Sequence, residues 1–542
     1  MPAELRQPDT QRSLALAQVS YGDVLRAQGK LAEARKALDA AVPALDALRA
    51  QGDASEATAI GLSAGLAAQS GAVFDDGGSL RDALPLAERA VAVLPPAAAA
   101  SGASLALRRA RAAALSQLGW LQFGGEQDEA ATESLRAALA VYRSIDQQWA
   151  DGSAAAGFAG TSASLMSNLI RLGRLADAEQ AGEDGLRVAT LLLDREPTNM
   201  VALRSRARIL GRLGIAAAEN LQPSRSLVLA DNATRDWALL ARIDPGNKGL
   251  NAALINSRRS AALALRDQGR LNEALGRLRD NQEFEPLAAT SNDVAEALWL
   301  SFYYASITAA ELGQAAEAER LFADCVRHLD TSQRGLPPDS FKFAFLGAIR
   351  TGKVELAHLS GDPARARAEA KGRREALMQL QPPDVYYQEF RATVLGLLHR
   401  ALGWADLQAG GFAAAEQQFR LAAEARQQTL VRTLGDRLGA ADEAALQAIA
   451  LAFGGHSAEA RALAEPALAW QREQQPLMSD YPLHHRSLAL ALLAVARSTP
   501  AKAKPLLAEA QAALDRLPAE WRAERKSRTL QGLIDDARRS AQ

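Results

Sequence analysis

The sequence predicts an all-α solenoid of about eleven antiparallel helix pairs, and three observations lead to this fold class. The chain has 542 residues, which is too long for a single hydrophobic core. It must therefore contain several domains, or a repeat array that can lengthen without enlarging its core. Its composition is 48% hydrophobic but only 5% aromatic, which suits closely packed helices with small side chains between them. The alternating pattern of a β-sheet is absent, whereas a spaced set of small residues recurs along the chain.

Each predicted helix pair carries a small residue in its first helix and further small or apolar residues twelve, sixteen and nineteen positions later. In the first copy these residues are Gly22, Ala34, Leu38 and Ala41. We expect the first of them to let the two helices approach closely, and the other three to form one stripe that faces the first helix and the next pair. Two further clear copies are Gly119, Ala131, Leu135 and Ala138, and Gly403, Ala415, Phe419 and Ala422.

The first position of this pattern recurs about every 47 residues. Eleven anchors follow from it: Gly22, Gly71, Gly119, Met166, Gly214, Ala262, Ser306, Val354, Gly403, Ala448 and Ala491. Met166 and Val354 depart from the rule of a small residue, so their two units are the weaker copies. The array is predicted to cover residues 1–518.

Glycine and proline mark the two kinds of connection in the array. Seven glycines fall between the two helices of a pair, where the helix ends and a left-handed backbone conformation is needed: Gly29, Gly173, Gly269, Gly313, Gly361, Gly410 and Gly455. Prolines fall between successive pairs, for example in DREPTN, RIDPGN and LQPPD, because proline closes one hairpin and opens the next.

These small residues resemble the signature of the tetratricopeptide repeat family, which has Gly or Ala at the eighth, twentieth and twenty-seventh positions of its unit. The resemblance covers essentially the whole chain and implies a right-handed superhelix whose concave groove binds peptides or helices of partner proteins. The family unit is about 34 residues long, so the resemblance is to a long-unit variant. Related long-unit helical arrays, including those attached to bacterial signalling proteins, are an alternative.

The two ends of the chain differ in the predicted array. Residues 519–542 are densely charged and are predicted to form a polar capping helix, since a terminal repeat needs a polar outer face. At the other end the pattern begins within about fifteen residues of Met1 with no such cap. We therefore expect an upstream domain, or a partner that packs on the N-terminal repeat.

The search for catalytic and metal-binding motifs predicts that the chain is not an enzyme. It contains no GxxxxGK[ST], GxGxxG, HExxH or GxSxG motif. Its six histidines include no pair four residues apart, and the adjacent His484 and His485, near Asp480, are interpreted as a surface pair. Cys325, the single cysteine, is interpreted as a buried packing residue. No metal site and no cofactor are predicted.

The groove positions implied by the resemblance predict a partner-binding site in the middle of the array. They are the second, fifth, ninth and twelfth positions of a unit, which are mostly Ala, Gly, Leu and Val in the outer units. In the middle they become polar and aromatic: Asn256, Arg259, Arg266, Tyr303, Thr351, Glu355, His358, Arg400 and Trp404. Arginine and aromatic residues commonly dominate interfaces, although Tyr303 and Trp404 are as consistent with core packing.

Charge is nearly balanced, with 62 Lys plus Arg against 63 Asp plus Glu, so no global field favours nucleic acid. Two local basic stripes, Arg204, Arg208 and Arg212, and Arg365, Arg367, Lys371, Arg373 and Arg374, are interpreted as solvated helix faces. No signal peptide and no membrane-spanning segment are predicted.

The predicted function is a cytoplasmic scaffold, or the sensing arm of a larger bacterial signalling protein, that binds a peptide or protein partner in its concave groove. Alternatives are a nucleic-acid-binding helical array and a regulatory subunit of an enzyme whose catalytic part lies outside this chain.

Overall fold

The computed structural model describes residues 7–75, 79–95, 98, 102–145, 149–334, 349–380, 385–429 and 433–540. These residues form α-helices, short 3-10 helices and turns, and none of them lies in a β-strand. The chain divides into two compact units. Unit 1 is Met1–Leu213 with Arg235–Asn247, and unit 2 is Gly214–Thr234 with Lys248–Gln542. The division crosses helices α9 (Met200–Glu219) and α10 (Pro223–Ile243).

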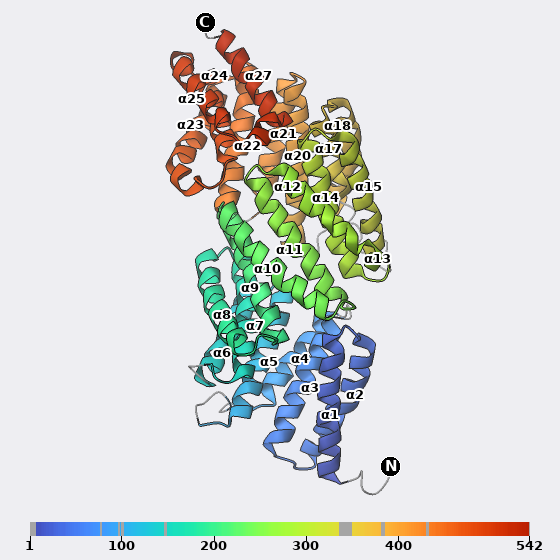
Figure 1. Cartoon of the computed structure of the whole chain (residues 1–542). Helices are drawn as coiled ribbons and strands as arrows, with labels where there is room; N and C mark the ends of the chain where they lie inside the picture. The colour runs from blue at the N-terminus through green and yellow to red at the C-terminus, as the bar shows by residue number, and fades with distance from the viewer. Residues whose placement is uncertain are drawn as a thin grey trace. The chain divides into compact units, whose positions relative to one another are not determined.

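Unit 1 contains four complete helix hairpins. In each, two consecutive helices pack against each other, and the first three hairpins also pack against the hairpin that follows (Figure 1). The pairs are α1 (Pro8–Ala27) with α2 (Leu31–Ala50), α3 (Glu56–Asp75) with α4 (Leu80–Ala92), α5 (Leu105–Gly124) with α6 (Asp128–Ile145), and α7 (Gly152–Arg171) with α8 (Leu175–Arg195).

Unit 2 continues the alternation with six hairpins and a C-terminal segment. The pairs are α11 (Lys248–Asp267) with α12 (Leu271–Arg279), α14 (Asn292–Glu311) with α15 (Ala315–Ser332), α17 (Gly352–Ser360) with α18 (Pro363–Ala370), α20 (Val385–Gln408) with α21 (Phe412–Arg426), α22 (Leu434–Phe453) with α23 (Ser457–Gln474), and α24 (His484–Ser498) with α25 (Ala503–Asp515). Shorter elements are η3 (Asp280–Phe284), α13 (Glu285–Ala288), η4 (Ile349–Thr351), α19 (Arg373–Gln379), η5 (Gln475–Met478), η6 (Pro500–Lys502), α26 (Ala519–Ala523) and α27 (Arg525–Ser540).

Helices α9 and α10 lie between α8 and α11 in the chain and bring the number of helix pairs in the described residues to eleven. Arg206 of α9 donates two hydrogen bonds of 2.8 Å to Asp236 of α10. The predicted fold class is therefore confirmed: the chain is an all-α solenoid of helix hairpins, the alternation expected of a tetratricopeptide-like array.

In three hairpins the glycine of the first helix faces the residue sixteen positions later, as the spacing predicted, whereas at Gly71 the nearest atoms belong to Arg26 and Gln117. A Cβ atom added at Gly22 would lie 2.7 Å from Leu38 Cγ, and one added at Gly119 would lie 2.6 Å from Leu135 Cγ. At Gly403 it would lie 2.5 Å from the ring of Phe419. Real Cβ atoms do not approach other carbons so closely, so glycine is what lets these helices meet.

Met166 departs from the small-residue rule because its hairpin reverses the two partners. Its sulfur would lie 2.5 Å from a Cβ atom added at Gly182, sixteen residues later on α8. The large residue stands on the first helix here and the glycine on the second. Val354 is followed at the same interval by Ala370, and both belong to one buried cluster. The contact thus needs one small partner, on either helix.

The seven glycines predicted at the turns all adopt left-handed backbone conformations, with φ between +71° and +92°. This prediction is confirmed. Glu126 takes the equivalent place between α5 and α6 with φ +59°, although a side chain makes this conformation unfavourable. The turn geometry is therefore kept even where the sequence offers no glycine.

Helix α3 is long and apolar enough to cross a membrane by length and composition, with a mean hydropathy of 1.3 over its most apolar window. Just over half of that window, 56%, is buried inside the structure. Its buried residues include Leu62 and Leu66, which belong to one core cluster with Val42 and Leu45 of α2. A core helix passes the same test, so this signal is weak.

Candidate functional site

All nine residues of the predicted groove belong to unit 2 and come from helices α11, α14, α17 and α20 or from η4. Asn256 is exposed, whereas His358 and Trp404 are buried, with 0% and 2% of their surface accessible. The other six, Arg259, Arg266, Tyr303, Thr351, Glu355 and Arg400, are partly buried. Burial leaves His358 and Trp404 no surface for a partner in this conformation.

Asn256 and Arg259 form a polar pair near the middle of α11. The Arg259 guanidinium donates a hydrogen bond of 2.7 Å to the Asn256 side-chain oxygen. Burial lowers the pKa of Arg259, while Tyr304 and Glu296 act in the opposite direction. Tyr303 packs beside Gly352, where an added Cβ would lie 2.7 Å from its ring.

Arg266, at the end of α11, forms a two-pronged ion pair with Glu311 of α14. Its Nε donates to Glu311 over 2.9 Å, and Glu311 is only 5% exposed. Burial alone would lower the pKa of Arg266, but the Glu311 carboxylate raises it overall. Next to this pair, burial raises the pKa of Asp267 to about 6, against the opposing effect of Arg266.

Glu355 and His358 lie one helical turn apart on α17. Burial by itself raises the pKa of Glu355, but the Lys526 ammonium, which donates a hydrogen bond to it, is the main cause that lowers this pKa to about 2. Burial lowers the pKa of His358 to about 3. The His358 ring stacks on Trp404 at 6.3 Å between centroids, and neither of its nitrogens has a hydrogen-bond partner among the described residues.

The ionic contacts continue onto α22 and α24, which the prediction did not include. Arg400 of α20 lies 3.4 Å from the carboxylate of Asp442 on α22, and burial raises the pKa of Asp442. Arg486 of α24 lies 3.2 Å from Glu524, whose surface is 0% exposed.

Six consecutive first helices of unit 2 therefore each place one charged residue in this ionic arrangement. We call these six residues the charged face: Arg266, Glu311, Glu355, Arg400, Asp442 and Arg486. Sequence reasoning found only the three that sit at groove positions.

The charged face holds a segment from the C-terminal part of the same chain, Pro518–Lys526. Trp521 of this segment is 1% exposed, and its ring lies 5.4 Å from the guanidinium of Arg266 and 5.4 Å from that of Arg486. Its indole nitrogen donates a hydrogen bond of 3.0 Å to the Arg266 carbonyl oxygen. An aromatic ring between two guanidinium groups gains cation–π attraction in addition to its burial.

Two further residues of this segment bind the ends of helices in the array. The Glu520 carboxylate accepts hydrogen bonds from the backbone N–H groups of Leu271 and Asn272, at the start of α12. The Arg525 guanidinium donates to the carbonyl oxygens of Leu359 and Ser360, at the end of α17, over 3.0 Å and 3.4 Å. Each charge matches the helix dipole, because anions are favoured at N-termini and cations at C-termini.

Unit 2 also closes on itself at a second place. Asp480 accepts hydrogen bonds from the backbone and the hydroxyl of Ser224, over 2.9 Å and 2.6 Å, although the two residues are 256 positions apart. Nearby, Leu221, Leu438 and Met478 share one buried cluster. Asp480 is thus engaged with Ser224. His484 is only 3% exposed, contacts the Tyr481 carbonyl oxygen, and lies with its ring 3.9 Å from that of His485 at a tilt of 43°, so the interpretation as a surface pair is wrong for His484.

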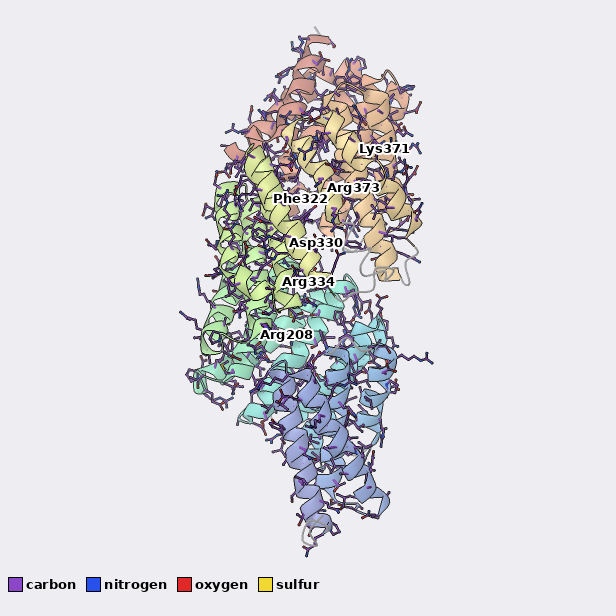
Figure 2. All side chains as sticks on the ribbon, turned by 90° about the vertical axis from the view of Figure 1, so that its right-hand side faces the viewer. Arg208, Phe322, Asp330, Arg334, Lys371 and Arg373 are labelled. Atoms are coloured by element: carbon purple, nitrogen blue, oxygen red, sulfur yellow. The ribbon has the colours of Figure 1, made fainter. Side chains whose placement is uncertain are left out.

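The two basic stripes differ in their surroundings. In the second stripe, Arg365, Arg367 and Arg373 pair with Glu319, Asp406 and Glu369, and Figure 2 labels Lys371 and Arg373 of this group. The first stripe, Arg204, Arg208 and Arg212 on α9, has no carboxylate partner among the residues that the structure describes.

Arg208, at the centre of the first stripe, has a carbon-rich rather than an acidic environment. It lies 5.8 Å above the Trp120 ring. Burial, with Arg212 and Arg204 adding like charge, lowers its pKa to about 10.

The described residues contain no exposed thiol and no group of metal ligands. Cys325 is 0% exposed, and burial raises the pKa of its thiol, so the interpretation as a buried packing residue is confirmed. Within the described ranges, no three His, Cys, Asp or Glu side chains are grouped as metal ligands.

No family model and no curated protein matches the chain. The solved structures similar to it include two that match over most of their lengths. The APC/C hetero-tetramer Cut9–Hcn1 has a TM-score of 0.32 and 13% identity, over 97% of this chain and 98% of that one. The human IFIT1 dimer with PPP-AAAA has a TM-score of 0.29 and 14% identity, over 79% of this chain and 94% of that one. These values are too low to carry a function from either protein to this chain.

Proposed function

We propose that the chain is a non-catalytic interaction scaffold, or the sensing arm of a larger bacterial protein, and that unit 2 binds a peptide or protein partner on its charged face and the adjoining residues Asn256, Arg259 and Thr351. The observation that carries this proposal is the docking of Pro518–Lys526 by side chains and helix ends from four different helices. A surface that holds one non-repeat segment through an aromatic anchor and paired charges has the features of a peptide-recognition site.

Composition supports the finer parts of this proposal. We place the protein in a bacterial cytoplasm, because the chain is rich in Ala and Arg and its single cysteine is a buried free thiol. We also assign the array to the tetratricopeptide repeat family as a variant with units of about 47 residues, on the recurring sixteen-residue contact between the two helices of a hairpin.

An affinity capture from native lysate tests the scaffold function. The intact chain is compared with the double variant Arg259→Ala, Thr351→Ala, whose residues are partly exposed, so folding should be preserved. The matched control is Arg270→Ala, Thr290→Ala, two exposed positions of the same unit. A protein captured by the intact chain and the control but lost from the variant supports a partner site at these residues. Equal capture by all three would contradict it.

Nucleic-acid binding is the second candidate function, supported by the stripe Arg204, Arg208 and Arg212, which has no carboxylate partner within the described part of the chain. A fluorescent single-stranded RNA should then bind with a slope of log affinity against log salt of about −2, as three phosphate contacts predict. A variant with all three arginines changed to glutamine should lose this salt dependence. Absence of binding by the intact chain at low salt would exclude this function.

A further inference from the structure

The segment Pro518–Lys526 differs in kind from the array that holds it. It follows the last predicted repeat contact, and α26 within it spans only Ala519–Ala523. Its partners Arg266, Leu271 and Leu359 precede it by about 165 to 255 residues in the chain. It therefore meets the array as a separate peptide would, through its side chains and not through hairpin packing.

The contacts of the segment define a short recognition pattern. An acidic residue binds the start of α12, the next residue is a tryptophan between two arginines, and three residues later Glu524 pairs with Arg486. Arg525 then binds the end of α17, and Lys526 pairs with Glu355. The pattern in one-letter code is EWxxERK, and each fixed position has its own partner.

One of these contacts is poorly satisfied, which bears on whether the segment stays in place. The Glu524 side chain is 0% exposed, yet its Oε1 has no hydrogen-bond partner among the described residues. Burial raises the pKa of this carboxyl in spite of Arg486 and Lys526. A buried, partly unsatisfied carboxylate costs free energy, so the docked state is stabilised less than its many contacts suggest. A surface pocket lined by Glu311, Gly313, Glu520 and Arg528 also lies along the segment.

We infer that Glu520–Lys526 is an internal ligand of the charged face, and that the partner of unit 2 carries a linear motif of the same chemistry, an acidic residue followed by tryptophan and then an acidic–basic–basic triplet. This inference rests on the proposed function. The partner motif and the internal segment bind the same groups, so the partner enters as the segment leaves. The segment then sets the threshold of partner binding.

A synthetic peptide with the sequence of residues 517–527, labelled with fluorescein, is the probe. Its binding to two full-length chains is measured by fluorescence anisotropy: the intact protein and the variant Trp521→Ala, Arg525→Ala, in which the internal segment is weakened. We expect at least about tenfold tighter binding to the variant, because the loss of one buried aromatic anchor commonly exceeds a tenfold effect. Adding Arg486→Ala to the variant should abolish binding, and a peptide with alanine in place of its tryptophan should bind neither chain.

The matched control chain is Trp470→Ala, Arg539→Ala, which loses the same residue types in unit 2 away from the segment. It should bind the peptide like the intact protein. The inference would be overturned if the peptide bound the intact protein and a folded segment variant with equal affinity, or if it bound both only weakly or not at all.

Hydrogen exchange of the intact protein keeps the test valid if the segment variant fails to fold. At saturating peptide, residues 518–527 should lose protection by at least about tenfold, while Leu271, Asn272 and the end of α17 stay protected. No change in any segment overturns the inference. The lysate capture distinguishes failure of this inference from failure of the proposed function. If the Arg259→Ala, Thr351→Ala variant loses a partner but the peptide binds no form of the chain, the scaffold function is supported and the proposed motif is wrong.

Discussion

The close contact between Gly403 and Phe419 predicts that a larger residue at position 403 destabilises the protein, and a second glycine on the same helix provides the control. Replacing Gly403 with alanine places a Cβ 2.5 Å from the Phe419 ring, and Phe419 is 0% exposed and packs edge-on against Trp404, so the ring has no room to move. Alanine in a helix gains about 0.5–1 kcal/mol over glycine, whereas overpacking a filled core costs about 1–3 kcal/mol. The overpacking is larger, so we expect Gly403→Ala to destabilise unit 2 by about 1–2 kcal/mol.

Gly396→Ala is the control, since it lies on the same helix α20 and an added Cβ there meets only ordinary contacts of 3.7 Å and 3.8 Å. It should stabilise the protein by about 0.5–1 kcal/mol through helix propensity alone. The measurement is urea unfolding followed by far-ultraviolet circular dichroism, with the two midpoints moving in opposite directions. If both variants stabilise the protein equally, the sixteen-residue contact does not limit the helix approach.

Three further outcomes follow from individual residues. Glu126→Gly should raise the free energy of unfolding by about 1 kcal/mol in the same assay, since glycine adopts φ +59° without steric strain; an unchanged or lower value contradicts this account of the turn. Arg266→Leu should lower it by about 3–5 kcal/mol by leaving the Glu311 carboxylate buried without a partner, and the double variant with Glu311→Leu should recover much of the loss, or the pair is not the cause. For His358 the folded pKa of about 3 lies below the ordinary value of 6.5, so its neutral form favours folding above pH 6.5 and this stability is lost as pH falls toward 3. Because Glu355, Lys526 and Arg525 also act on this ring, the test compares two chains. Between pH 7 and pH 5 the free energy of unfolding of His358→Phe should fall by about 2 kcal/mol less than that of the native chain. Parallel plots of this free energy against pH would refute the assignment.

The hairpin array was predictable from the sequence because its determinants are local. Gly22 and Leu38 lie in one hairpin, and so do Gly119 and Leu135, so a fixed interval records their contact. The left-handed turn at Gly29 depends on a single residue. The Met166 unit seemed irregular only because smallness was sought on the first helix. A rule that one member of each pair be small would have included it.

The site was less predictable because its determinants are distant in sequence. Arg266, Glu355 and Arg400 were found from their positions within the repeat, but their carboxylate and ammonium partners were not. Glu520, Glu524 and Arg525 belong to a densely charged stretch, which locally indicates a solvated helix. Their surroundings depend on helix ends far upstream, and no local pattern records such a pairing.

The long-range contacts of Trp521 and Asp480 have a consequence for the order in which the protein assembles. An open repeat array can fold hairpin by hairpin as it leaves the ribosome, since each hairpin needs only its neighbours. Unit 2 differs, because Ser224 cannot bind Asp480, nor the start of α12 bind Glu520, until these later residues have been made. The ion pair of Arg266 with Glu311 is likewise complete early in synthesis but stays open to water until Trp521 arrives. Folding of unit 2 therefore includes a late closing step, in which Pro518–Lys526 covers helices that are among the first of the unit to be made.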